Sequence, residues 1–214
     1  MNINKMLNGE ENKKNKNKVK LLNKSIEGRV CHDRISILPV LINHHGSVKT
    51  YVEIGTLHGG SMSLVIQEKI ADSLFIGIDL FEYTNFGENP KKIDPKGFIV
   101  DESIARKNID SNNNDNQFFL IKGDSRSKNT IDSFKKILNG RLVDFLFVDG
   151  LHTKEGVVSD FENYKVFLNE GAYVVFDDYN DHKGVREGVM SIIKDIDGFE
   201  IVGNFDNEFL IIKK

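Results

Sequence analysis

The sequence predicts an α/β fold built on a doubly wound, mostly parallel sheet. Strand-like apolar runs fall at 51–55, 75–80, 118–123, 143–149 and 172–177. Helix-like segments separate them at 61–71, 128–138, 154–168 and 185–196. Strands that alternate with helices form parallel sheets covered on both faces. The runs at 199–205 and 209–213 have no helix between them and predict a hairpin with an antiparallel last strand. We therefore expect a Rossmann-like, seven-stranded sheet with helices on both faces.

The first predicted strand carries an acid, Glu53, and then breaks into glycines where a helix begins. Gly55 lets the chain leave the strand, and Gly59 and Gly60 would let the backbone approach a ligand. Ser61 is placed to cap the following helix. An ordinary strand–helix loop also favours glycine and serine, so this turn alone does not establish a ligand site.

The second predicted strand ends in another acid, Asp79. Its spacing of about 20 residues from the glycine turn is the one at which an acid binds ribose hydroxyls in nucleotide-binding sheets. The order of Glu53 and the glycines differs from GxGxxG, which disfavours NAD. Glu53 would repel a pyrophosphate and attract an ammonium or sulfonium group. These features favour S-adenosylmethionine, and His58 inside the turn is a further candidate contact.

Length and charge limit the domain organisation and the partners. The 214 residues suit one domain, 25–214, preceded by a lysine-rich arm, 1–24, that we expect to be solvated and flexible. The arm carries a net charge of +5, so the remainder carries −8. An acidic body disfavours nucleic acid. No membrane span or signal peptide is visible, which predicts no membrane partner and a cytoplasmic location.

Three segments interrupt the regular pattern. Residues 81–100 hold two prolines and several aromatic residues. This segment is too long for a simple connection between a strand and a helix, and we interpret it as a substrate lid or a surface insertion. Residues 35–43 predict a helix or an irregular lead-in. The asparagine-rich stretch 110–116 predicts a solvated turn.

The ends of the fourth and fifth predicted strands carry acids: Asp149 on one and Asp177 and Asp178 on the other. Adjacent strands lie about 4.8 Å apart, so these acids should meet at one edge. Both Asp177 and Asp178 can join only if the chain turns as it leaves the strand. Clustered carboxylates need a raised pKa or a cation, and oxygen ligands favour Mg²⁺, Mn²⁺ or Ca²⁺ over Zn²⁺. Acids that cap helices or face solvent are the alternative.

His152 follows Asp149 by three residues and precedes a predicted helix. Histidine titrates near neutral pH and can act as a general base, although a helix-entry histidine is a common structural feature. His182 is a second candidate for a substrate contact. His32, His44 and His45 have no supporting context in the sequence.

Together these residues resemble the class I S-adenosylmethionine-dependent methyltransferases, and more narrowly the small metal-dependent O-methyltransferases related to catechol and macrolide-sugar enzymes. The resemblance runs from about residue 50 to the C-terminus. It is carried by the following motifs: Val52-Glu-Ile-Gly55 with Gly59 and Ser61, Asp79, Gly123-Asp-Ser125, Val148-Asp-Gly-Leu-His152 and Phe176-Asp-Asp-Tyr179. The catechol branch fits less well, because its enzymes use a lysine base and often an asparagine as third metal ligand.

The resemblance implies a role for each motif. The cofactor residues would be Glu53 and Gly55 for the methionine moiety, with Thr56, His58, Gly59 and Ser61 in the same turn, Asp79 for the ribose, and Asp124 and Ser125 near the adenine. The resemblance also implies that Asp149, Asp177 and Asp178 hold a divalent metal, for which we expect Mg²⁺, and that His152 is the base.

These implications lead to one predicted activity. We expect methyl transfer from S-adenosylmethionine to a hydroxyl of a small molecule or sugar, assisted by Mg²⁺, with Asp149 and His152 as the catalytic pair. A metal-independent methyltransferase and a non-catalytic adenosyl-binding protein remain alternatives, and an NAD oxidoreductase is the weakest one. Relatives commonly form homo-oligomers, but the sequence leaves the oligomeric state and the acceptor open.

Overall fold

The computed structural model describes residues 5–6, 9–30, 32–68, 72–83 and 91–214. Seven strands form one sheet: β1 (Thr50–Ile54), β2 (Leu74–Asp79), β3 (Gln117–Lys122), β4 (Val143–Val148), β5 (Leu168–Phe176), β6 (Phe199–Phe205) and β7 (Glu208–Lys213). The α-helices are α2 (Glu10–Ser25), α3 (Ile37–His45), α4 (Gly60–Val65), α5 (Glu102–Asn112), α6 (Lys128–Leu138), α7 (Lys154–Tyr164) and α8 (Lys183–Lys194). Short 3₁₀ turns are η1 (Asp33–Ser36) and η2 (Lys165–Phe167).

The strand order across the sheet is β3-β2-β1-β4-β5-β7-β6. Strands β1 to β5 pair in parallel, while β7 runs antiparallel to both β5 and β6. This arrangement confirms the predicted fold class, including the terminal hairpin. The order reverses between β1 and β4, and open α/β sheets bind their ligands beyond the carboxyl ends of the strands at such a reversal.

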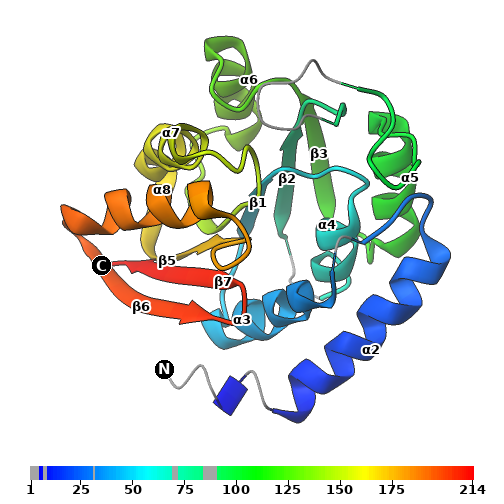
Figure 1. Cartoon of the computed structure of the whole chain (residues 1–214), viewed down its shortest axis with the longest axis horizontal. Helices are drawn as coiled ribbons and strands as arrows, with labels where there is room; N and C mark the ends of the chain where they lie inside the picture. The colour runs from blue at the N-terminus through cyan, green and yellow to red at the C-terminus, as the bar shows by residue number, and fades with distance from the viewer. Residues whose placement is uncertain (1–4, 7–8, 31, 69–71, 84–90) are drawn as a thin grey trace.

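Helices cover both faces of the sheet (Figure 1). Alternate strand residues point to opposite faces. On β1, Tyr51 packs in the core beneath α2, α3 and α4, while Val52 and Ile54 pack in the core beneath α6, α7 and α8. Glu53 has the same parity as Tyr51, so its carboxylate lies on the α2–α4 side of the sheet.

The N-terminal segment differs from the flexible arm that its composition predicts. Residues 10–25 form α2, which packs beside α3 and α4 at the lower right of Figure 1. Its buried residues are spaced three and four apart: Asn12, Asn15, Val19 and Leu22. This spacing forms one helical stripe that packs on the domain while the lysines face solvent. Overall composition hides such a stripe, because it counts lysines without regard to the face they occupy.

Several predicted boundaries also need correction. Residues 110–112 end helix α5 rather than form a turn, and Asp101 caps that helix by accepting the backbone N–H of Ser103. Helix α4 ends at Val65, earlier than residue 71. The residue before α4 is Gly59, so Ser61 lies in the first turn and does not cap it. In the described part of the chain, no helix is both long and apolar enough to cross a membrane.

Candidate functional site

Backbone hydrogen bonds align the residues that follow four parallel strands at the carboxyl edge of the sheet. The hydrogen-bond ladder continues one residue past each strand: Gly55 N–H donates to Ile78 O at 2.9 Å, Gly123 to Asp79 at 2.8 Å, Asp149 to Ile54 at 2.8 Å and Asp177 to Val148 at 3.0 Å. The residues that follow these strands therefore lie along one edge of the sheet, which we call the rim. The sequence predicts this position for the acids that follow β4 and β5.

Gly55 places the exits of β1 and β4 against each other. It has a φ of 94°, and a Cβ at this position would overlap the carbonyl oxygen of Asp149. Gly59 and Gly60 face protein instead of an open site, because their Cβ positions point at Ala105 and Ile109 of α5 and at Val30 respectively. The expectation that these two glycines admit a ligand is not supported by the space around their α-carbons.

Glu53 is a buried carboxyl beside the glycine turn. Its side chain has no exposure, and Tyr51 Oη donates to Oε2 at 2.9 Å. Burial raises the pKa of Glu53 to about 7. The other oxygen, Oε1, makes no hydrogen bond of normal geometry among the described residues, although the hydroxyls of Ser61 and Thr56 lie near the carboxylate and oppose the rise in its pKa. A buried, unsatisfied carboxylate oxygen is costly, so this atom is suited to meet a cationic ligand group.

Asp79 closes the turn after β1. Its Oδ2 accepts the N–H of Leu57 at 2.8 Å, and Oδ1 accepts the N–H of Phe81 at 2.5 Å. Burial raises the pKa of Asp79, and the backbone donors oppose that shift. The neighbouring Thr56 is buried, and its hydroxyl has no partner among the described residues. Asp79 thus orients the Thr56–Leu57 turn whatever else it binds.

His58 contacts the segment predicted as a lid. Its Nε2 lies 3.1 Å from the carbonyl oxygen of Ile99, and burial lowers the pKa of His58. Arg29 Nε donates to the buried Asp94 at 2.5 Å, which ties the same segment to the chain before η1. Residues 84–90 of the predicted lid lie outside the described residues. The described part is anchored beside the glycine turn.

Asp124 and Ser125 follow β3 at the far side of the rim. Arg126 binds Asp124 with Nε at 2.8 Å and Nη2 at 2.7 Å, and this pairing lowers the pKa of Asp124. Ser125 Oγ donates to Asp160 at 2.5 Å. Burial raises the pKa of Asp160 to about 6. Both residues therefore already have protein partners.

The acids of β4 and β5 meet histidines at the rim. His152 Nε2 lies 3.3 Å from Asp149 Oδ1, and His152 Nδ1 lies 3.5 Å from Asp178 Oδ2. Asp178 has a φ of 58°, a left-handed conformation that turns the chain as it leaves β5. Asp177 and Asp178 can therefore approach one group, and His32 Nε2 lies 3.1 Å from the former and 3.9 Å from the latter. This turn meets the condition that the sequence prediction required.

Electrostatics shows how closely these acids are gathered. Burial, Asp177 and Asp178 together raise the pKa of Asp149 well above its usual range, and Glu53 also contributes. Strands β1 and β4 are paired, so Glu53 lies on the strand next to the one that Asp149 follows. Such crowding is relieved by protonation or by a bound cation. Carboxylate oxygens are the ligands that hard divalent ions prefer. Among the described residues, however, the groups with ligand atoms within 4.8 Å of one another are His152 with Asp178 and His182, and His32 with Asp177 and Asp178. A cation held by Asp149, Asp177 and Asp178 would therefore require their side chains to move closer together.

The sequence does not predict three residues that lie at this rim: His32, Asn207 and Glu208. Burial lowers the pKa of His32, but its hydrogen bond to Asp177 and the charges of Asp177 and Asp149 together outweigh that effect, and the net shift is upward. Asn207 Nδ2 donates to Asp178 Oδ1 at 2.7 Å. Glu208 is buried, and burial together with Asp177 raises its pKa to about 9. No local motif marks these residues, because they reach the rim from the N-terminal segment and the terminal hairpin.

A family model described as a methyltransferase domain matches residues 52–179. This match spans more than half of the chain and includes the glycine turn and the acidic rim. The chain belongs to the methyltransferase domain family. It is a class I methyltransferase, the class that depends on S-adenosylmethionine.

Other proteins are similar to this methyltransferase over most of its length. An uncharacterised protein of Acanthamoeba polyphaga mimivirus is 34% identical over 201 residues, which cover 89% of this chain and 83% of that protein. An O-methyltransferase from Bacillus cereus, solved with S-adenosylhomocysteine, has a TM-score of 0.61 at 17% identity, covering 94% of this chain and 91% of that one. The O-methyltransferase TomG from Streptomyces achromogenes, solved with S-adenosylmethionine, has a TM-score of 0.58 at 15% identity, covering 96% and 90%. At these identities the two structures share the fold.

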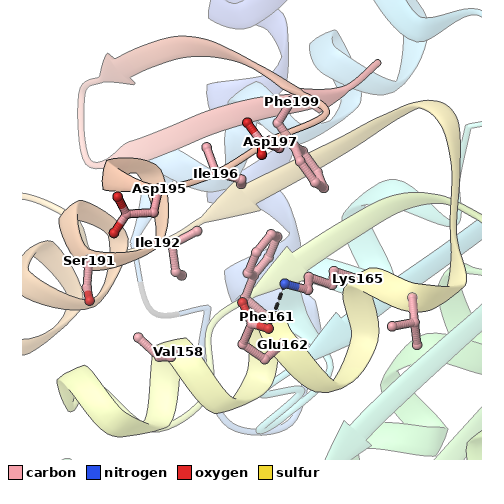
Figure 2. Close-up of a pocket in the computed structure, with 11 residues that line it drawn as sticks. Val158, Phe161, Glu162, Lys165, Ser191, Ile192, Asp195, Ile196, Asp197 and Phe199 are labelled. Atoms are coloured by element: carbon pink, nitrogen blue, oxygen red, sulfur yellow. Dashed lines mark ion pairs between the residues drawn. The ribbon is translucent and has the colours of Figure 1, made fainter.

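A cavity elsewhere in the methyltransferase does not include the rim. It lies between α7, α8 and the start of β6, and its lining includes Phe161, Lys165, Ile192 and Phe199 (Figure 2). Phe161 and Ile192 belong to the later turns of α7 and α8, whereas His152 and His182 precede the first turns of these helices. None of the predicted site residues lines this cavity.

Proposed function

We propose that this methyltransferase transfers a methyl group from S-adenosylmethionine to a hydroxyl of a small acceptor, assisted by a divalent cation. The supporting observation is the adjacency of the Glu53–Gly55 turn to the acids at the ends of β4 and β5. Gly55 packs on the carbonyl of Asp149, and Glu53 contributes to the raised pKa of that residue. The turn that we propose for the cofactor and the acids that we propose for the cation would therefore share one rim.

Residues at the carboxyl ends of β1, β2 and β3 would hold the cofactor. Oε1 of Glu53 would receive the ammonium of the methionine moiety, and the Gly55–Ser61 turn, with Thr56 and His58, would lie beside it. Asp79 would meet the ribose, and Asp124 with Ser125 would lie toward the adenine. Asp124 and Ser125 would need to share or exchange their bonds to Arg126 and Asp160.

The acids Asp149, Asp177 and Asp178 would hold the cation, most simply Mg²⁺. When bound, S-adenosylmethionine supplies an electrophilic methyl group, and the cation supplies charge that lowers the pKa of an acceptor hydroxyl. His152 would accept the hydroxyl proton as general base. Asp149, 3.3 Å from its Nε2, would stabilise the charged imidazole. The rim would mainly contribute orientation and electrostatic stabilisation.

The test combines a variant with chelation. We expect Asp149→Ala to lower cation-dependent methyl transfer by at least ~100-fold, since it removes both a proposed ligand and the partner of His152. Binding of S-adenosylmethionine, measured by calorimetry, should change only a few-fold. The matched control is Asp132→Ala, which removes an exposed aspartate on α6.

Two outcomes would favour other functions. Unchanged turnover after exhaustive chelation would favour a metal-independent transfer in which His152 acts alone. Tight cofactor binding without methylation of any hydroxylated compound would favour a non-catalytic adenosyl-binding protein.

A further inference from the structure

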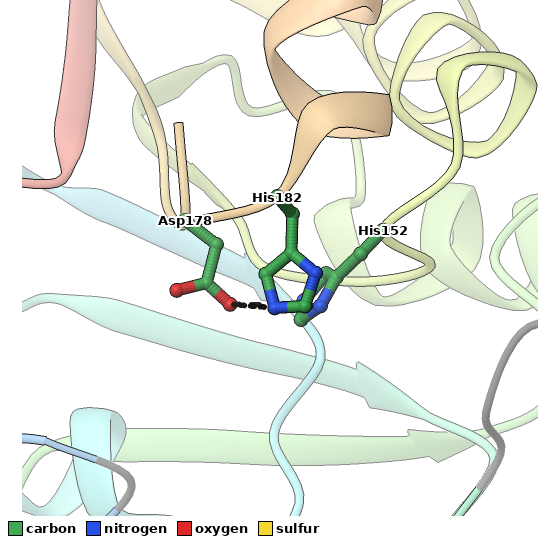
Figure 3. Close-up of side chains that lie close together, drawn as sticks. All are labelled: His152, Asp178 and His182. Atoms are coloured by element: carbon green, nitrogen blue, oxygen red, sulfur yellow. Dashed lines mark ion pairs between the residues drawn. The ribbon is translucent and has the colours of Figure 1, made fainter. Parts of the chain in front are cut away.

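Two histidines face one carboxylate oxygen at the rim (Figure 3). His152 Nδ1 and His182 Nε2 each lie 3.5 Å from Asp178 Oδ2. The two imidazole centroids are 4.4 Å apart. One ligand atom from each residue lies within 4.8 Å of the other two. Three donors from the starts of α7 and α8 and the end of β5 thus converge on one point.

These separations suit donors arranged around a shared ion. Around a tetrahedral Zn²⁺, with bonds of about 2.0–2.1 Å, ligand atoms lie about 3.4 Å from one another. Asp149 completes the arrangement, because its Oδ1 lies 3.3 Å from the other ring nitrogen of His152. A carboxylate that accepts the second N–H of a metal-bound histidine fixes its tautomer and orientation.

The two oxygens of Asp178 face different partners. Oδ1 accepts a hydrogen bond from Asn207 and lies 3.9 Å from His32, whereas Oδ2 faces His152 and His182. The side chains of His152 and His182 are 27% and 34% exposed, so an ion can reach them without opening the core. Two imidazoles and one carboxylate favour a borderline cation over Mg²⁺.

We propose that His152, Asp178 and His182 form a second cation site, selective for ions of the Zn²⁺ class, that inhibits the enzyme. The inhibition rests on the proposed function, in which His152 is the base. A neutral imidazole has one lone pair, and an ion bound at Nδ1 occupies it and leaves Nε2–H directed at Asp149. His152 then has no site for the acceptor proton.

Direct binding tests the site without any assay of activity. Metal-stripped protein is titrated with Zn²⁺ in the absence of cofactor and in excess Mg²⁺, which competes for the carboxylate site, and we expect one Zn²⁺ ion per chain. His182→Ala should weaken this affinity at least tenfold, while His45→Ala, a change on α3, should leave it within two-fold. Equal affinity in the wild type and His182→Ala overturns the proposal. Thermal unfolding checks the variant, and His182→Gln replaces it if the alanine protein is not folded.

The activity measurement separates this proposal from the methyltransferase function. With Mg²⁺ present, added Zn²⁺ should inhibit wild-type transfer, and His182→Ala should need at least tenfold more Zn²⁺ for the same fractional inhibition of its own rate. If the wild type transfers no methyl group, the proposed function fails while the difference in Zn²⁺ affinity still stands. If Zn²⁺ binds as expected but wild-type and variant transfer are equally inhibited, the inhibitory role is overturned.

Discussion

Gly55 shows how one backbone position connects the two halves of the site. Its φ of 94° is readily reached only by glycine, and its missing Cβ leaves room for the carbonyl of Asp149. Asp178 makes the complementary turn at the end of β5, where aspartate tolerates the left-handed region better than most residues. The proximity of the cofactor turn and the acids depends on these two turns.

A matched pair of glycine substitutions tests this role. Gly55→Ala should lower the free energy of unfolding by ~3 kcal/mol or more, because it combines an unfavourable φ with a backbone overlap. Gly171→Ala has a similar φ of 78° but no atom within 4 Å of its Cβ position, so we expect ~1 kcal/mol. Denaturant unfolding measures both. Equal losses would mean that contact with Asp149 is unimportant.

Helix α2 extends the methyltransferase domain at its N-terminus. Ser36 Oγ donates to the buried Asn12 at 2.7 Å, and the helix packs beside α3 and α4. In the chain that follows α2, Arg29 pairs with Asp94, and His32 pairs with Asp177. The chain that follows this helix therefore contacts both the described part of residues 81–100 and the acidic rim.

Adjacent leucines on α2 provide the test at this scale. Leu22 is 4% exposed and Leu21 is 66% exposed. Leu22→Ala should lower the free energy of unfolding by ~2–3 kcal/mol, since it leaves a cavity against the domain, while Leu21→Ala should stay within ~0.5 kcal/mol. Chemical denaturation compares them. A negligible effect of Leu22→Ala would instead support the flexible arm that the composition predicts.

The molecule as a whole buries several carboxyl groups with raised pKa values. Burial raises the pKa of Glu53 to about 7, of Asp160 to about 6 and of Glu208 to about 9. The folded protein therefore holds more protons than the unfolded chain at intermediate pH. Its free energy of unfolding should fall as the pH rises from about 5 to 8.

Glu53→Gln tests this dependence. The stabilisation from protonated Glu53 is fully present below about pH 4.5 and is lost as the pH rises through about 7. The variant should therefore lose less stability than the wild type between pH 5 and 8, by up to about 3 kcal/mol. Unfolding at several pH values measures the slopes, with the exposed Glu170→Gln as control. Parallel slopes for the wild type and Glu53→Gln would show that Glu53 is ionised throughout.

The sequence by itself determined the sheet, the terminal hairpin and the position of an acid at the ends of β2, β4 and β5. These features follow from local periodicity and from glycine and carboxyl groups at strand ends, which neighbouring residues in the chain reveal. Only the tertiary structure decided the stripe of α2 and the meeting of His32, Asn207 and Glu208 with Asp177 and Asp178. These contacts join distant segments, such as His32 and Asp177 at 145 residues apart, and are set by how helices and hairpin pack on the sheet.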